Sequence, residues 1–111
     1  MTLEEMRDTI DVLDRQLVEL LSARARAVLQ IGRLKAVSSL PVYEPTREKL
    51  IYANVRAVNK GPLPDIELTR IFERLIDVMR SLEMHESDIE KNAQAIPPGQ
   101  RTGGETPETG K

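Results

Sequence analysis

The strongest constraint on the fold is a series of apolar residues near the N-terminus whose spacing alternates between four and three residues. Thr2 and Glu5 have the spacing of a capping box, which marks a helix start just before the series. The series reaches about residue 37 and comprises Met6, Ile10, Leu13, Leu17, Leu20, Ala27, Ile31 and Leu34, with one interruption at position 24. A helix of this length extends for roughly 50 Å at about 1.5 Å per residue. A domain of this size is narrower, so the helix needs a partner along its seam, and a second copy of the same helix is the natural candidate.

Two prolines separate this helix from the next. Pro41 ends the first helix, because the residue before a proline is pushed out of the α region. Pro45 fits the first position of a second helix, where its missing N–H is not needed, and it leaves Glu44 at the cap. We expect this second helix over residues 45 to 59.

A third helix is expected over residues 64 to 90, after Gly61, which suits a left-handed turn at the end of the second helix. The C-terminal segment is rich in Pro, Gly, Thr and Glu and carries almost no apolar residues, which is typical of disorder. The sequence therefore predicts an all-α domain over residues 1–92 and a disordered tail or linker stub over residues 93–111.

Composition excludes several classes of function. The chain has no cysteine and one histidine, which argues against a disulfide framework, a thiolate nucleophile or a metal site built by the protein. Its formal net charge of -2 gives no basic field for nucleic acid. No apolar run is long enough for a signal peptide or a membrane span, so we expect a cytoplasmic protein without a cofactor.

Charged residues interrupt the apolar faces of all three helices. Arg24 occupies a seam position of the first helix, and Lys35, eleven residues later, lies on nearly the same face. Glu48, with Arg47 beside it, begins the apolar face of the second helix, and Glu83 continues that of the third. Each charge alone could be explained by a snorkelling stem or by an ion pair of Arg24 with Glu48 or Glu83. Together they favour a polar internal pocket, because each uncompensated buried charge costs several kcal/mol.

Arg7 precedes Arg24 by 17 residues, which is about 25 Å along a helix and roughly 100 degrees around it. The two cannot hold one small ligand from a single straight helix. If the long helix pairs antiparallel with its copy, Arg7 of one chain approaches the region from Arg24 to Lys35 of the other. The alternative is that Arg7 is a solvated residue of the first helical turn.

Such a pocket can position a ligand and stabilise its charge, but it supplies no nucleophile. Guanidinium groups match carboxylates and Lys adds a compact charge, so the pocket should hold a small organic anion with more than one carboxylate. The sequence offers no Ser/His or Cys/His pair and no Gly-rich phosphate loop. His85 falls on a different side of the third helix from Glu83, and we expect it at the surface.

The sequence resembles the AroQ-type chorismate mutases over residues 3 to 86. The resemblance rests on "MRDTIDVLDRQLVELLSARARAVLQIGRLK", "LPVYEPTRE" and "IFERLIDVMRSLE", and on the spacing of Arg7, Arg24, Lys35 and the Arg47-Glu48 pair. It implies three helices per chain in an intertwined dimer that rearranges chorismate to prephenate in phenylalanine and tyrosine biosynthesis.

The resemblance also implies roles for single residues. Arg7 from the partner subunit and Arg24 would bind the substrate carboxylates. Lys35 would bind a carboxylate and the ether oxygen, while Arg47 adds positive field near the site. Such a pericyclic reaction needs a held conformer and fixed donors to developing charge, which agrees with the missing nucleophile.

The remaining roles fall on acidic residues. Glu48 would accept the hydrogen bond of the ring hydroxyl, and Glu83 would reach the ether oxygen from the side opposite Lys35, donating only when protonated. Glu44 stands where the family often has Asp, and we expect the longer acid to contact the hydroxyl less well. Met79 replaces a hydroxyl residue that often supports a carboxylate, so that contact should be missing.

Two alternatives remain. Isochorismate pyruvate lyase shares the three-helix scaffold and the cationic pocket, although the "YEPTRE" segment fits the mutase better. The other alternative is a non-catalytic or regulatory helical dimer domain of a larger shikimate-pathway enzyme, with the tail as its linker.

Overall fold

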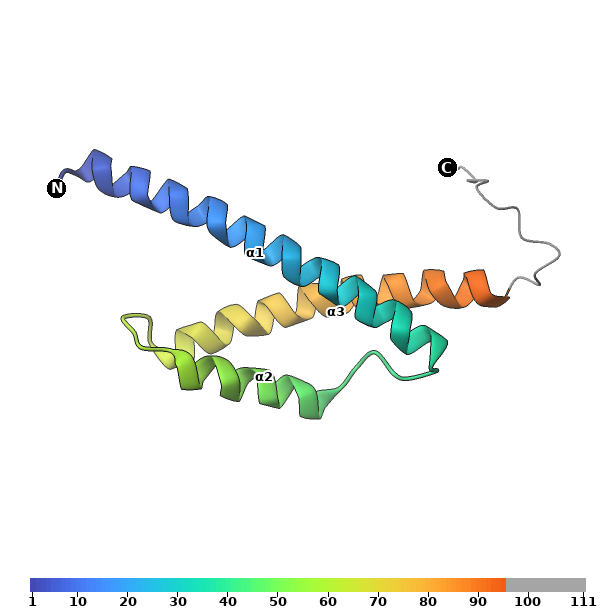
Figure 1. Ribbon diagram of the computed structural model, residues 1–111. Coiled ribbons are helices and arrows are strands. Elements are labelled where there is room, and N and C mark those ends of the chain that lie inside the picture. Colours follow the sequence, from blue (N-terminus) through green and yellow to red (C-terminus); the bar gives the residue numbers. More distant parts are fainter. Residues whose placement is uncertain (96–111) are drawn as a thin grey trace.

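The computed structural model describes residues 1–95, and over that range it contains three α-helices (Figure 1). These are α1 (Leu3–Val37), α2 (Pro45–Val58) and α3 (Asp65–Ala95). None of the described residues forms a strand. The predicted all-α architecture of one long helix followed by two more is confirmed.

The residues predicted to start the first two helices do so in the structure. The Thr2 hydroxyl accepts a hydrogen bond from the Glu5 N–H at 3.0 Å, and the Glu5 carboxylate accepts one from the Thr2 N–H at 2.7 Å. This capping box satisfies two amides that the first turn of α1 leaves without partners. Pro45 is the first residue of α2, and Glu44 is its N-cap.

The turn between α2 and α3 is held by one side chain. The Asn59 amide donates to the Leu63 carbonyl at 2.8 Å and to the Asp65 carboxylate at 2.7 Å, and its oxygen accepts from the Gly61 N–H at 3.1 Å. Gly61 has a φ of 74°, the left-handed conformation predicted for it.

The third helix is longer than the sequence predicted. It ends at Ala95, five residues beyond the expected end at 90, and so includes the first residues assigned to the tail. Lys, Gln and Ala in the last turn are good helix formers and explain the extension. The rest of the predicted tail lies outside the described residues.

The C-terminal half of α1 crosses α3, and α2 packs along the N-terminal half of α3 (Figure 1). α1 and α2 make no close backbone contact with each other. The buried apolar core is correspondingly small and consists of Val28, Ala36, Ile76 and Met79. The space between α1 and α2 is therefore left open for a site.

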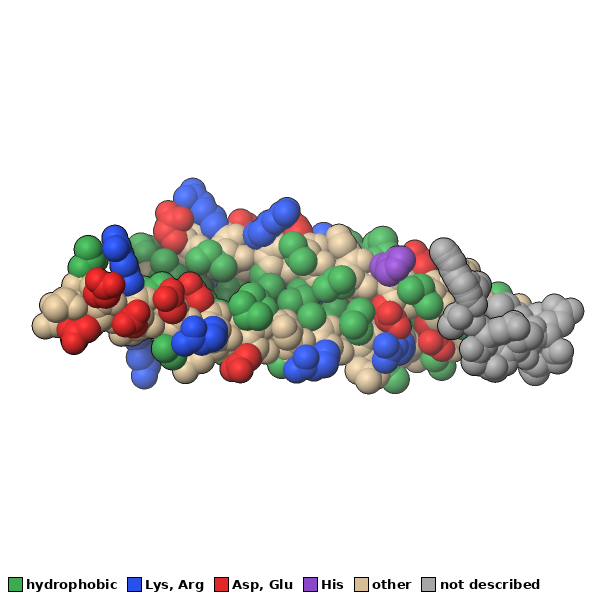
Figure 2. Space-filling model, turned by 90° about the horizontal axis from the view of Figure 1, so that it is seen from above, with side chains coloured by type: hydrophobic (Ala, Val, Ile, Leu, Met, Phe, Trp, Pro, Cys, Tyr) green, Lys and Arg blue, Asp and Glu red, His purple; other side chains and the backbone are tan. Residues whose placement is uncertain are grey.

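The N-terminal half of α1 extends away from the other two helices (Figure 1). Its seam residues are exposed, among them Leu17 at 55% and Leu20 at 68%. Figure 2 shows hydrophobic side chains gathered along the middle of one face, with charged side chains on both sides of them. The radius of gyration is 19.1 Å, against about 13 Å for a compact chain of about 100 residues. Over residues 1–95, no helix is both long and apolar enough to cross a lipid bilayer.

Candidate active site

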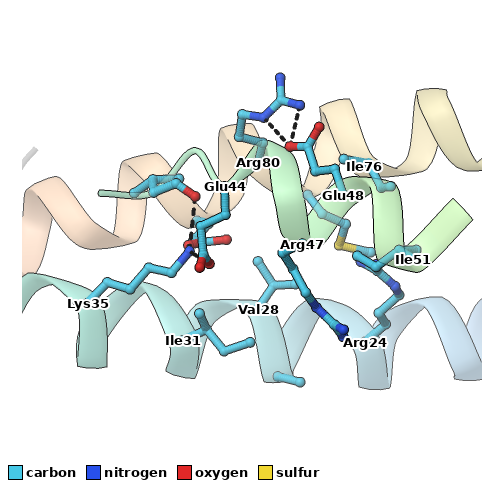
Figure 3. A pocket seen from close by; sticks show the side chains of 14 residues that line it. Arg24, Val28, Ile31, Lys35, Glu44, Arg47, Glu48, Ile51, Ile76 and Arg80 are labelled. Carbon is cyan, nitrogen blue, oxygen red and sulfur yellow. Dashed lines mark hydrogen bonds and ion pairs between the residues drawn. The ribbon is translucent and has the colours of Figure 1, made fainter. Parts of the chain in front are cut away.

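A pocket of about 340 Å³ lies between α1 and α2, and α3 lines its remaining side (Figure 3). This volume is in the range of small-molecule sites. Its walls combine apolar side chains of all three helices with charged ones. Six of the seven site residues predicted from the sequence line it: Arg24, Lys35, Glu44, Arg47, Glu48 and Glu83.

Lys35 is the most enclosed charge of the pocket, with 10% of its side chain exposed. Its ammonium nitrogen lies 2.6 Å from Oε2 of Glu44 and 2.6 Å from Oε2 of Glu83, and it donates to the Val42 carbonyl at 2.9 Å. Burial lowers the pKa of Lys35, but the two carboxylates outweigh burial, so this pKa is raised above its ordinary value. Lys35 is therefore a cation across the neutral range.

Oε2 of Glu83 is buried, and its partner among the described residues is the Lys35 ammonium group. The Glu83 side chain is 12% exposed, against 49% for Glu44. Glu44 is the N-cap of α2, yet its side chain makes no capping hydrogen bond, because its carboxylate reaches to Lys35 instead. The two acids thus approach one cation from α3 and from the start of α2.

Arg24 and Arg47 face the pocket without an anionic partner among the described residues. Figure 3 shows Arg24 extending from α1 toward α2 and Arg47 extending from α2 toward α1. The ion pair of Arg24 with Glu48 or Glu83, considered from the sequence, is not formed. Two unpaired guanidinium groups at one opening make a site suited to carboxylates.

Glu48 is paired with Arg80 of α3, a residue that the sequence analysis missed. Arg80 donates from Nη2 at 2.6 Å and from Nε at 3.1 Å, both to Oε2 of Glu48. The hydrogen bond to Glu48 raises the pKa of Arg80 above its ordinary value. Arg80 follows Ile76 by four residues and precedes Glu83 by three, so helical periodicity could have placed it on the pocket face.

Two further predictions concern residues away from the pocket. Arg7 lies on the exposed N-terminal half of α1 and does not line the pocket of its own chain. His85 is exposed, as predicted. No group of three or more acidic, His or Cys side chains within residues 1–95 is arranged to hold a metal ion.

The charges of the pocket favour an anionic ligand. Four cationic side chains against three acidic ones line it, an excess of one positive charge. Two of the four cations are already neutralised by acids, so the unpaired charge is concentrated on Arg24 and Arg47. Fold and pocket together define an all-α domain with a pocket between three helices that carries two unpaired arginines.

Residues 6–84 match the model of the family described as chorismate mutase type II. The chain belongs to this family, and the resemblance seen in the sequence is confirmed. Among solved structures, it is similar to chorismate mutase (Form II) from Thermus thermophilus, with a TM-score of 0.72 and 36% identity, covering 73% of this chain and 92% of that one.

The chain is also similar to curated proteins whose names include chorismate mutase. The chain is 34% identical over 85 residues to the bifunctional chorismate mutase/prephenate dehydratase of Aquifex aeolicus, which covers 73% of this chain and 24% of that protein. It is 29% identical over 82 residues to the chorismate mutase of Methanocaldococcus jannaschii, covering 73% of this chain and 83% of that protein. The chain thus spans about a quarter of the length of the bifunctional relative.

Proposed function

We propose that this chain is a chorismate mutase, which rearranges chorismate to prephenate by a pericyclic [3,3] shift in the biosynthesis of phenylalanine and tyrosine. The observation that carries the proposal is the pair of unpartnered arginines, Arg24 and Arg47, opposite the buried Lys35–Glu83 pair in a member of the chorismate mutase type II family. The substrate is a dicarboxylate, and the reaction needs no nucleophile, metal or cofactor from the protein.

The first task of the pocket is to hold the flexible substrate in a reactive conformer. Arg24 binds one carboxylate, Lys35 contributes to binding a carboxylate, and Arg47 adds positive field at the opening. Holding the two ends of the rearranging system together supplies the entropic part of the catalysis. Glu48 accepts the hydrogen bond of the ring hydroxyl through the oxygen that Arg80 leaves free.

The second task is to stabilise charge that develops on the ether oxygen as its bond to the ring breaks and the new carbon–carbon bond forms. Lys35 donates to this oxygen from one side. Glu83 lies on the other side. Both side chains are largely enclosed, so the Lys35 donor acts where water screens it little.

The proposal includes a homodimer in which each site draws on both chains. Arg7 lies too far along α1 to reach the pocket of its own chain. An apolar groove beside the pocket, lined by Val18, Leu21 and Ala25 of α1 and by Ile71, Leu75 and Val78 of α3, is suited to the long helix of a second copy. Arg7 of the partner subunit then completes the carboxylate site. We also propose that the protein is cytoplasmic, as predicted from the sequence.

The test is to follow the loss of chorismate absorbance and to identify the product. Prephenate is the expected product. Release of pyruvate from isochorismate, with no turnover of chorismate, would favour the lyase alternative. No turnover of either substrate would favour a non-catalytic or regulatory domain.

A further inference from the structure

Arg80 connects three segments that line the pocket. It lies on α3, it donates two hydrogen bonds to Glu48 of α2, and its guanidinium carbon lies 4.9 Å from the centre of the Tyr43 ring in the segment before α2. The last contact has the geometry of a cation–π interaction. A third contact, with Asp77 one turn earlier on α3, is longer at 3.5 Å.

The hydrogen bonds fix how Glu48 can act. Both come to the same oxygen, Oε2, as Figure 3 shows, and no described residue donates to Oε1. The Glu48 side chain is 18% exposed, and an enclosed carboxylate is costly without a charged partner. Arg80 thus leaves Glu48 with one free oxygen that can only accept a hydrogen bond.

The contacts of Arg80 with Glu48 and Tyr43 also help to hold α2, the helix that forms one wall of the pocket. No residue of α2 is fully buried, and α2 makes no close backbone contact with α1. Its position over the pocket therefore depends strongly on side-chain contacts with α3. The bond from Arg80 to Glu48 lies in the first turns of α2, next to Arg47, where a shift of the helix would move both side chains.

We propose that Arg80 is a positioning residue that orients Glu48 as a permanent acceptor for the substrate hydroxyl. The inference rests on the proposed mutase function and adds to it a residue that touches Glu48 rather than the substrate. Arg is suited to this task because its planar fork directs two N–H groups at one carboxylate, which the point charge of Lys cannot do.

The experiment is a double-mutant cycle in chorismate turnover with Arg80→Gln, Glu48→Gln and the double variant. We expect Arg80→Gln alone to lower kcat/KM by about tenfold to a hundredfold, the range of a misplaced binding group. In the Glu48→Gln background the same substitution should change kcat/KM by less than about threefold, because the ion pair between the two side chains is already lost. A structural role of Arg80 that does not act through Glu48 would lower activity equally in both backgrounds.

Arg70→Gln is the matched control, since Arg70 lies on the same helix and forms an exposed ion pair with Glu67 at 3.1 Å. It should leave kcat/KM unchanged. If Arg80→Gln does not fold, Arg80→Lys tests the same point. We expect its kcat/KM to be only part of the wild-type value.

Equal losses in both backgrounds would overturn the inference, as would a loss below about threefold for Arg80→Gln alone. Full recovery with Arg80→Lys would also overturn it, because charge without orientation would then suffice. A wild-type chain that does not convert chorismate would refute the proposed function itself, and the inference with it.

Discussion

Gly32 of α1 packs directly against the backbone of Glu83 of α3. A Cβ atom at Gly32 would lie 2.8 Å from the Glu83 carbonyl oxygen and 3.3 Å from its Cγ. Two helices can approach this closely only where one of them lacks a side chain. The contact also sets the distance between Lys35, which lies three residues further along α1, and the carboxylate of Glu83.

Gly32→Ala should therefore destabilise the protein and lower its activity. Alanine gains up to about 1 kcal/mol of helix propensity, but forcing a methyl group against a backbone oxygen costs typically about 1–3 kcal/mol. We expect a net loss in the free energy of unfolding, measured by urea titration, and a lower kcat as Glu83 is displaced. Gln30→Ala, at an exposed position of α1, is the control. An unchanged or increased stability of Gly32→Ala would contradict the close packing.

Arg24→Ala should separate activity from stability. Removing one preorganised donor typically costs about 2.7 to 4 kcal/mol in the transition state, or about 10²–10³ in rate. Arg24 has no ion-pair partner within residues 1–95, so its removal should change the free energy of unfolding by less than about 0.5 kcal/mol. Arg26→Ala, at an exposed position on the same helix, should affect neither property. Near-normal turnover of Arg24→Ala would favour a non-catalytic pocket.

Lys35→Ala should lose both activity and stability. Its ammonium group is the common partner of Glu44 and Glu83, and without it two carboxylates face each other in a partly enclosed site. We expect a destabilisation of about 3 kcal/mol, the lower end for a broken buried pair, because Glu44 is half exposed. Thermal unfolding measures it. The addition of Glu44→Gln should restore part of the stability but not the turnover, and the absence of any recovery would refute the shared ion pair.

Arg7→Ala and Arg24→Ala chains should complement each other if each site uses both subunits. In a mixed dimer, one site retains Arg7 of one chain and Arg24 of the other, whereas the second site lacks both. With random exchange, we expect recovery of up to about a quarter of wild-type activity. Each variant mixed with itself is the control, and subunit exchange is checked with tagged chains. Exchange without recovery would rule out the shared site.

Glu83→Gln tests whether a hydrogen-bond donor at this position supports turnover. The raised pKa of Lys35 keeps the ammonium group charged between pH 5 and 8 in both proteins, so Lys35 contributes no decline in that window. The Gln amide donates a hydrogen bond without titrating. We expect Glu83→Gln to keep substantial turnover at neutral pH, measured by the loss of chorismate absorbance. Loss of turnover in this variant would exclude a donor at position 83.

Local sequence signals account for much of the fold. The start of α1 follows from Thr2 and Glu5, and the start of α2 from Pro45, because these interactions lie within one helical turn. The end of α3 was placed too early, since the last turn has helix-forming residues but little apolar pattern.

The site was predicted less completely than the fold. Charges that interrupt an apolar stripe, such as Arg24 and Lys35, are visible in the sequence because the pattern predicts something else there. Arg80 gave no such signal, because Asp77 three residues earlier offers it a local partner, while its main partner Glu48 is on another helix. The contact of Lys35 with the Val42 carbonyl could not be predicted either, since every residue carries a backbone carbonyl.

The exposed N-terminal half of α1 has a consequence for how this protein is handled. An isolated helical segment of this length is marginally stable in water, and its apolar residues are exposed in the single chain. If a second copy covers its seam, folding and association are one equilibrium, and the melting temperature rises with protein concentration. Dilution then lowers the specific activity, so rates measured at nanomolar enzyme and unfolding curves measured at micromolar enzyme refer to different populations of the molecule.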